Sequence, residues 1–198
     1  MSPKPDVSQE RKQQITQAAQ KVFSRLGFHQ ARMSDIAEES GLSKGTLYLY
    51  FDSKDEIIIN LLDNLFEPEF QDLKSLVDLD LPAPERIRKY TERVIADMER
   101  MLKWMPIAFE FVSLAFRRET VQEVLQSYYK EHLHIITPLF EQGLERGEFS
   151  PHDPEAAAIA LGAIIEGTAL LWVYDRQNLD VGDRIRSSVN LVLQGLEP

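Results

Sequence analysis

The stretch Met33–Phe51, which reads MSDIAEESGLSKGTLYLYF, decides the fold of the chain around it. Its first half spaces four small or apolar side chains at helical intervals, which indicates a helix with one packed face: Met33, Ile36, Ala37 and Ser40. Gly41 follows where that helix should end, because glycine enters the left-handed backbone region at little cost. Ser43 can then cap a second helix over Lys44–Tyr50. Two helices joined by such a short turn form a helix-turn-helix.

The outward side chains of the second predicted helix suit contact with DNA. Lys44 stands at the helix start, where it can reach a phosphate or a guanine edge. Gly45 lets the backbone approach closely, and Thr46 offers a methyl group and a hydroxyl. Tyr48 and Tyr50 offer hydroxyls to phosphate oxygens. From these residues alone, a helical hairpin with a solvated face is an equal alternative.

The run Ile15–Glu56 resembles the DNA-binding domain of the TetR family of bacterial regulators. The resemblance rests on Ala18-Ala19, Phe23, Gly27-Phe28, Asp35-Ile36-Ala37, the run from Gly41 to Tyr48, Phe51 and Ser53-Lys54. The rest of the chain matches that family only in length and helical pattern. Family members often carry Thr or Ser where this chain has Ala31 and Arg32, so Ser34 could cap the helix here and Arg32 could supply a phosphate contact.

The resemblance implies a helix-turn-helix DNA-binding domain over residues 8–54 and a helical effector-binding and dimerisation domain over residues 55–198. It also implies which residues meet DNA: Arg32, Met33, Ser34, Ser43, Lys44, Gly45, Thr46, Tyr48, Tyr50 and Lys54. The fold class is all-α, with a three-helix N-terminal domain, a larger helical domain and about nine helices in total.

Charge is divided unequally along the chain. The net charge is −10, but residues 1–54 contain eight Lys or Arg and six Asp or Glu, a net charge of +2, which leaves −12 for residues 55–198. This asymmetry favours docking of the small domain on phosphate while the acidic body stays away. Cysteine is absent, which excludes disulfides, thiol catalysis and thiolate metal sites and fits a reducing bacterial cytoplasm. The apolar stretch Ala156–Val173 contains Glu166 and is interpreted as a buried helix, so no membrane span is expected.

Helix boundaries follow from capping patterns and prolines. Ser53–Glu56 and Thr120–Glu123 both match the S/T-x-x-E capping box, and Asp153-Pro154-Glu155 is typical of a helix start. Pro68 is predicted to kink or end the helix that begins near Lys54. Pro106 is predicted to separate a helix ending near Trp104 from a short helix over Ile107–Arg117.

The aromatic helical body suggests a pocket for an apolar or amphipathic small-molecule effector. Its predicted lining is Phe66, Met101, Trp104, Phe109, Glu110, Tyr128, His132, Glu166 and Trp172. The alternative is that these side chains simply form the core. The carboxylates would also suit a cationic effector.

The last two helices are expected to form a homodimer by packing against their mates as a four-helix bundle, as the family does. Such a dimer would present two recognition helices to a palindromic operator on double-stranded DNA. Effector binding would then shift the helix after Ser53, and the protein would act as a repressor that is released from its operator.

No catalytic, metal or cofactor site is expected. His132 and His134 lie two residues apart, on different faces of one helix, so they cannot share a metal. The sequence has no Gly-rich phosphate loop and no nucleophile elbow. The alternative to a repressor is a small-molecule sensor or protein-partner adaptor whose helix-turn-helix no longer binds specific DNA.

Overall fold

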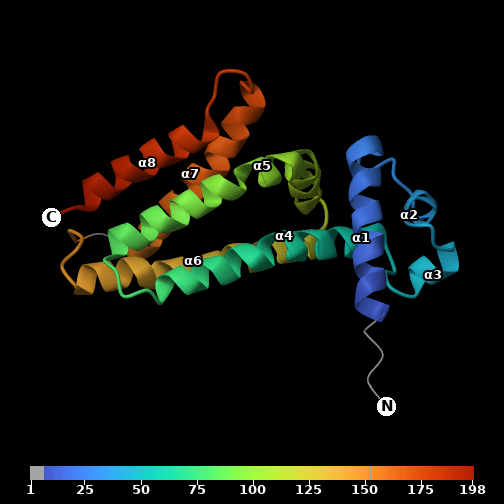
Figure 1. Ribbon diagram of the computed structural model, residues 1–198, viewed down its shortest axis with the longest axis horizontal. Helices are drawn as coiled ribbons and strands as arrows, with labels where there is room; N and C mark the ends of the chain where they lie inside the picture. The colour runs from blue at the N-terminus through green and yellow to red at the C-terminus, as the bar shows by residue number, and fades with distance from the viewer. Residues whose placement is uncertain (1–6, 152) are drawn as a thin grey trace, which may run out of the picture. The chain divides into compact units, whose positions relative to one another are not determined.

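The computed structural model describes residues 7–151 and 153–198, which form helices and the turns between them (Figure 1). In chain order the helices of this described part are α1 (Val7–Leu26), α2 (Met33–Ser40), α3 (Lys44–Tyr48), α4 (Lys54–Val77), α5 (Ala83–Ala115), α6 (Glu119–Glu145), α7 (Pro154–Tyr174) and α8 (Val181–Leu196). The predicted all-α class, with a three-helix helix-turn-helix region at the N-terminus, is confirmed.

The described chain separates into two compact units. Unit 1 contains the residues up to Glu67 together with Met105–Leu125, and unit 2 contains Pro68–Trp104 and Gln126–Pro198. Helices α4, α5 and α6 therefore contribute residues to both units. The units are defined by packing, whereas the predicted division after residue 54 concerns which residues meet DNA and which meet an effector. That functional division stays a prediction.

Unit 1 is built on the apolar faces that the helical spacing predicts. α1 packs on α2 and α2 packs on α3, with Ile15, Val22, Ile36 and Leu47 fully buried. Burying an aliphatic side chain of this size contributes about 1.5–3 kcal/mol relative to leaving it exposed. This packing matters most for α3, because a helix of five residues is not stable by itself.

The turn between α2 and α3 has the predicted chemistry. Gly41 is left-handed, with φ 68° and ψ 19°, and its amide donates to the carbonyl of Glu38 at 3.1 Å. Ser43 then caps α3, because its Oγ accepts a hydrogen bond from the amide of Thr46 at 3.0 Å. Both predicted turn residues are confirmed.

The starts of the later helices follow the predictions in two cases of three. Ser53 Oγ accepts from the amide of Glu56 at 3.2 Å and caps α4. Asp153 accepts from the first amides of α7, at 3.0 and 3.3 Å. The predicted capping box at Thr120 is wrong, because α6 already begins at Glu119. Its first turn closes on the carbonyl of Arg118.

Pro68, predicted to kink or end a helix, and Pro106, predicted to separate two helices, both lie within helices. α4 continues through Pro68 to Val77, and α5 continues through Pro106, so the two helices predicted around Pro106 are one. An internal proline costs about 3 kcal/mol. Burial of the next turn offsets that cost, through Phe70 and Leu73 in α4 and through Ile107 and Phe111 in α5.

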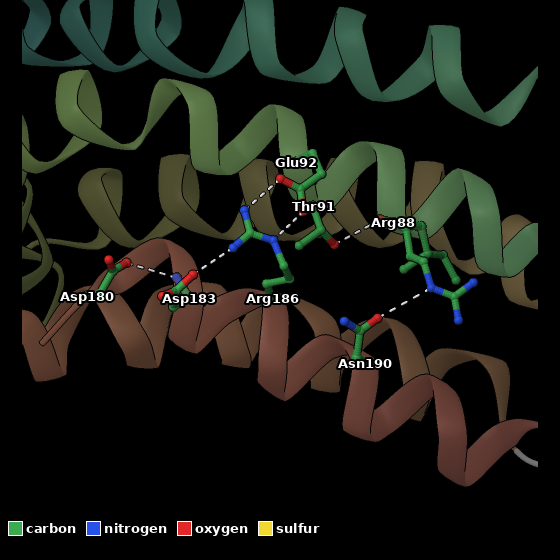
Figure 2. A network of polar contacts seen from close by, with 8 residues as sticks. Arg88, Thr91, Glu92, Asp180, Asp183, Arg186 and Asn190 are labelled. Carbon is green, nitrogen blue, oxygen red and sulfur yellow. Dashed lines mark hydrogen bonds and ion pairs between the residues drawn. The ribbon is translucent and has the colours of Figure 1, made fainter.

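In unit 2, a polar network joins α5 to α8 (Figure 2). Arg186 donates to both carboxylate oxygens of Glu92, at 2.6 and 2.9 Å, and to Asp183 at 2.8 Å. Arg88 donates to Asn190 at 3.3 Å, one turn further along α8. The hydrogen bonds from Arg186 lower the pKa of Glu92. Paired, fork-shaped contacts of this kind set the register of α8 on α5.

Helix α7 packs on α8 and is the most apolar helix of the chain. It is long and apolar enough to cross a membrane by length and composition alone, and 33% of its most apolar window is buried within the chain. The prediction of a buried helix is therefore corrected. One face packs inward through Leu161 and Ile165, while Ile159, Leu170, Leu171 and Tyr174 are exposed.

Candidate nucleic-acid interface

Helix α3 is anchored by one residue and presents the others to solvent. Leu47 is fully buried, whereas Lys44, Gly45 and Tyr48 are exposed. The Lys44 ammonium lies 5.9 Å from the centre of the Tyr48 ring. The helix thus carries a positive charge and a phenol on one open face, with a glycine beside them that leaves room for close approach.

Two hydroxyl groups of the same segment form hydrogen bonds at the N-terminal end of α3. Ser43 Oγ and Thr46 Oγ1 are hydrogen-bonded to each other at 2.8 Å, in addition to the cap described above. Ser43 is exposed, while Thr46 and Tyr50 are half-buried. These three predicted DNA contacts therefore lie next to Lys44 and Tyr48, but two of them present less surface.

Leu49 was not among the predicted contacts, yet 81% of its surface is exposed. It caps the C-terminal end of α3 between Tyr48 and Tyr50. An apolar side chain this exposed is available for contact with an apolar group of a partner, such as a thymine methyl group. The signal in the sequence was its position two residues after Leu47, which takes it off the buried face.

At the start of α2, the structure separates the three predicted contacts. Arg32 and Ser34 are exposed, whereas only 9% of the Met33 side chain is exposed and it packs inward. The expectation that Ser34 caps α2 is corrected, because Arg32 is the cap residue. The Arg32 amide donates to the carboxylate of Asp35 at 2.8 Å, and the Arg32 residue is exposed.

Lys54 was predicted to meet phosphate, but its ammonium is directed into unit 1. Its Nζ donates to the carbonyl oxygens of Phe28 and Ala31, each at 2.6 Å, and lies 4.7 Å from the centre of the Phe28 ring. Partial burial lowers the pKa of Lys54, and the nearby Asp55 and Glu110 oppose that effect. In this arrangement Lys54 stabilises the turn between α1 and α2 by binding two of its carbonyl oxygens.

Glu110 was predicted to line a ligand pocket, and the structure gives it a different contact. Its carboxylate accepts a hydrogen bond from the amide of Phe28, in the same α1–α2 turn that Lys54 holds. The sequence alone does not reveal this contact, because the two residues lie 82 positions apart.

The other predicted ligand residues are distributed over both units. Phe66 and Phe109 belong to unit 1 with Glu110, while Tyr128, His132, Glu166 and Trp172 belong to unit 2. The side chains of Met101 and Trp104 lie outside the described part of the structure. In unit 2, Tyr128 lies beside Phe70, with ring centres 6.4 Å apart, and Arg176 lies 4.8 Å from the Trp172 ring.

Among the predicted ligand residues, His132 has a buried ring nitrogen, Nε2. Among the residues that the structure describes, no group hydrogen-bonds to its buried Nε2. A Cβ placed on Gly162 of α7 would lie 3.4 Å from this nitrogen. Burial lowers the pKa of His132, which keeps the imidazole neutral. Desolvation also raises the pKa of Glu166, one turn beyond Gly162, but Glu166 is exposed, so water limits this effect.

Comparison with known proteins agrees with this geometry. Residues 15–61 match the model for bacterial regulatory proteins of the tetR family, and residues 83–193 match the model for the C-terminal domain of BetI-type transcriptional repressors. YfiR, an HTH-type transcriptional regulator of Bacillus subtilis, is 31% identical over 164 residues, which are 79% of this chain and 77% of the relative.

Two solved structures show the same fold. A transcriptional regulator from Saccharomonospora viridis in complex with choline has a TM-score of 0.79 and 21% identity, over 94% of this chain and 96% of that chain. FadR from Bacillus subtilis in complex with stearoyl-CoA has a TM-score of 0.75 and 24% identity, over 93% of this chain and 99% of that chain.

These relatives are named as transcriptional regulators, and the second family model alone covers more than half of the chain. The match to the first model contains the whole helix-turn-helix with its outward Lys44 and Tyr48. This chain belongs to the tetR family of bacterial regulatory proteins and is a DNA-binding transcriptional regulator with a BetI-type C-terminal domain.

Proposed function

We propose that this regulator is a repressor that binds a palindromic operator as a homodimer and leaves it when a small-molecule effector binds. The observation that carries the proposal is the construction of α3. Ser43 caps this helix and Leu47 anchors it, so that Lys44, Gly45 and Tyr48 are held open to solvent. A short helix fixed in this way can enter a major groove without rearranging.

The contacts that we assign to DNA differ in kind. Lys44 binds a phosphate or a guanine edge, and Tyr48 donates its hydroxyl to a phosphate. Arg32 binds the phosphate backbone beside the start of α2, with Ser34 next to it. We add Leu49 as a contact to a thymine methyl group, and we assign Lys54 and Met33 to the support of the helices. Leu49→Asn should therefore change the preferred base at one operator position.

The homodimer is proposed from the exposed face of α7. Its four exposed apolar side chains share that face with the small residue Ala163, and Leu191 of α8 is also exposed. An apolar face of this extent on one chain favours burial against a second copy. Sedimentation of Leu170→Glu beside the wild type tests it, since a charge in the interface should shift the protein towards monomer.

The effector is proposed to be apolar or amphipathic and to bind the helical domain over residues 55–198. The supporting groups are the buried ring nitrogen Nε2 of His132, which faces Gly162 of α7, and the carboxyl of Glu166 one turn further along α7. The relatives in complex with choline and with stearoyl-CoA bind ligands that have both polar and apolar parts. We propose that the protein is cytoplasmic, has no cofactor and catalyses no reaction.

In the proposed mechanism, the effector displaces α4 and thereby changes the spacing of the two recognition helices. In the operator-bound dimer these helices would lie about 34–36 Å apart, one turn of DNA. A coupling free energy of about 1–3 kcal/mol between the effector and DNA is typical of such switches. If effector and DNA bind without mutual effect, this mechanism is excluded.

Selection of random DNA duplexes by the purified protein, followed by sequencing of the bound pool, tests the proposed function. A palindromic motif with two half-sites is the expected result. If the folded protein enriches no motif, it is not a sequence-specific repressor under those conditions, and the reading as a sensor or adaptor is favoured.

A further inference from the structure

The turn between α1 and α2 is held by side chains from two later helices. Gly27 ends α1 in the left-handed conformation, with φ 76°. Both backbone polar groups of the next residue, Phe28, are bound by charged side chains. The Phe28 amide donates to Glu110 of α5, and the Phe28 carbonyl accepts from Lys54 of α4 at 2.6 Å.

The fit around Glu110 is close. A Cβ added to Gly27 would lie 3.0 Å from Glu110 Oε1, and the positive φ would strain a larger residue. The glycine therefore has two uses here: it turns the chain, and it leaves space for the carboxylate. Burial lowers the pKa of Lys54, and the negative charge of Glu110 is one of the groups that oppose this lowering.

The position of this turn is transmitted to the DNA-binding helices. Only 2% of Phe28 is exposed, and its ring centre lies 5.3 Å from that of Phe23 in α1. Ala31, whose carbonyl also accepts from Lys54, directly precedes the cap residue of α2. A shift of the turn would thus change the placement of α1 and of the start of α2 together.

A second contact of the same kind lies nearby in unit 1. Arg118, in the turn between α5 and α6, forms an ion pair with Asp55 at the start of α4. The end of α5 and the turn after it are therefore tied to two elements: the α1–α2 turn through Glu110, and α4 through Arg118.

We propose that Glu110 is a positioning residue for DNA binding, through which the end of α5 fixes the α1–α2 turn and hence the orientation of α2 and α3. The inference rests on the proposed function, because its consequence is a change in operator affinity. It differs from the mechanism described above in that the connection runs through α5 in addition to α4. Helix α5 also supplies residues to unit 2, so a change there can reach Glu110 along one helix.

Three variants test this role. Glu110→Ala removes the acceptor, and Glu110→Gln keeps an oxygen that can accept from the Phe28 amide. Glu123→Ala is the matched control, since it removes an exposed carboxylate from the same unit. Hydrogen exchange of the Phe28 amide reports the contact itself. Fluorescence anisotropy on a duplex from the selection reports affinity, with the folded fraction checked by circular dichroism.

The expected result is faster Phe28 exchange in Glu110→Ala and a dissociation constant for DNA about 5-fold or more above that of the wild type. Glu110→Gln and Glu123→Ala should stay within about 2-fold of the wild type, well below the range of typical coupling. An unchanged exchange rate of the Phe28 amide in Glu110→Ala would refute the hydrogen bond between this amide and Glu110, whatever the DNA affinity. Faster exchange with unchanged affinity overturns the positioning role. A wild-type protein that selects no duplex overturns the proposed function and this role with it, while the exchange measurement still reports the contact.

Discussion

Replacing Lys54 with methionine separates the two roles that this residue could have. If Lys54 met phosphate, as its position at the start of α4 suggests, its loss would weaken DNA binding and leave the fold intact. In the structure its ammonium instead joins the carbonyl oxygens of Phe28 and Ala31 at 2.6 Å. Lys54→Met keeps most of the apolar stem and removes these two short hydrogen bonds, together with a longer one to the carbonyl of His29 at 3.4 Å.

The expected loss of stability follows from those two contacts. A hydrogen bond that involves a charged group contributes about 1.5–3 kcal/mol. Lys54 is half-buried, so water can replace part of each contact. We expect the free energy of unfolding to fall by about 2–4 kcal/mol, measured by urea denaturation.

Lys44→Met is the matched control, because Lys44 is exposed on α3. It should leave unfolding unchanged and reduce the slope of log K against log salt by about 0.9, the value for one lost phosphate contact. Lys54→Met should keep the wild-type slope. A Lys54→Met protein with wild-type stability and a flatter slope would refute the assignment of Lys54 to the fold.

Three further changes have definite expected outcomes. Burial lowers the pKa of His132 in the folded state, so lowering the pH below the ordinary histidine pKa of about 6.5 should reduce the free energy of unfolding by at most about 1.4 kcal/mol per pH unit. Urea unfolding between pH 7.5 and 5.5 should show a weaker pH dependence in His132→Gln than in the wild type, and an unchanged dependence in the exposed His134→Gln. Gly143→Ala would place a Cβ 2.3 Å from the Phe149 ring and should destabilise the protein by about 1–3 kcal/mol in thermal unfolding. The control Gly195→Ala has no atom within 4 Å of its added Cβ and should be neutral or stabilising, so equal effects of the two variants would contradict the packing of Phe149. Tyr48→Phe should raise the operator dissociation constant about 2–12-fold through one lost hydroxyl contact with unchanged melting, and an unaltered constant would remove Tyr48 from the interface.

The helix-turn-helix could be predicted from the sequence because its determinants are local. The left-handed backbone at Gly41 ends α2, and the side chain of Ser43 caps α3 by accepting from an amide three residues further on. Helical spacing places Leu47 on the buried face. The same holds for the cap at Asp153. Such features need no knowledge of what packs against them, and the structure has each where it was predicted.

The errors arise where distant residues decide. Pro106 remains within one helix, and α4 does not end at Pro68, because residues beyond both prolines are buried, which no local rule states. Lys54 and Glu110 carry charges that look free in the sequence, and their partners lie 26 and 82 residues away. Met33 is an exception, because its local helical spacing already placed it on the packed face and the structure buries it there.

The exposed apolar face of α7 shows a third limit. Its composition predicts burial, and the single chain buries only one side of it. Composition cannot distinguish burial within a chain from burial against a second copy, since both require the same apolar surface.

Hydroxyl-radical footprinting on a duplex from the selection tests the central claim most directly, which is that α3 of each protomer in a dimer reads one half-site. The wild type should protect two patches on one face of the DNA, centred about 10 base pairs apart. Lys44→Ala at the same protein concentration should lose both. A single protected patch, or full protection by Lys44→Ala, would contradict the account.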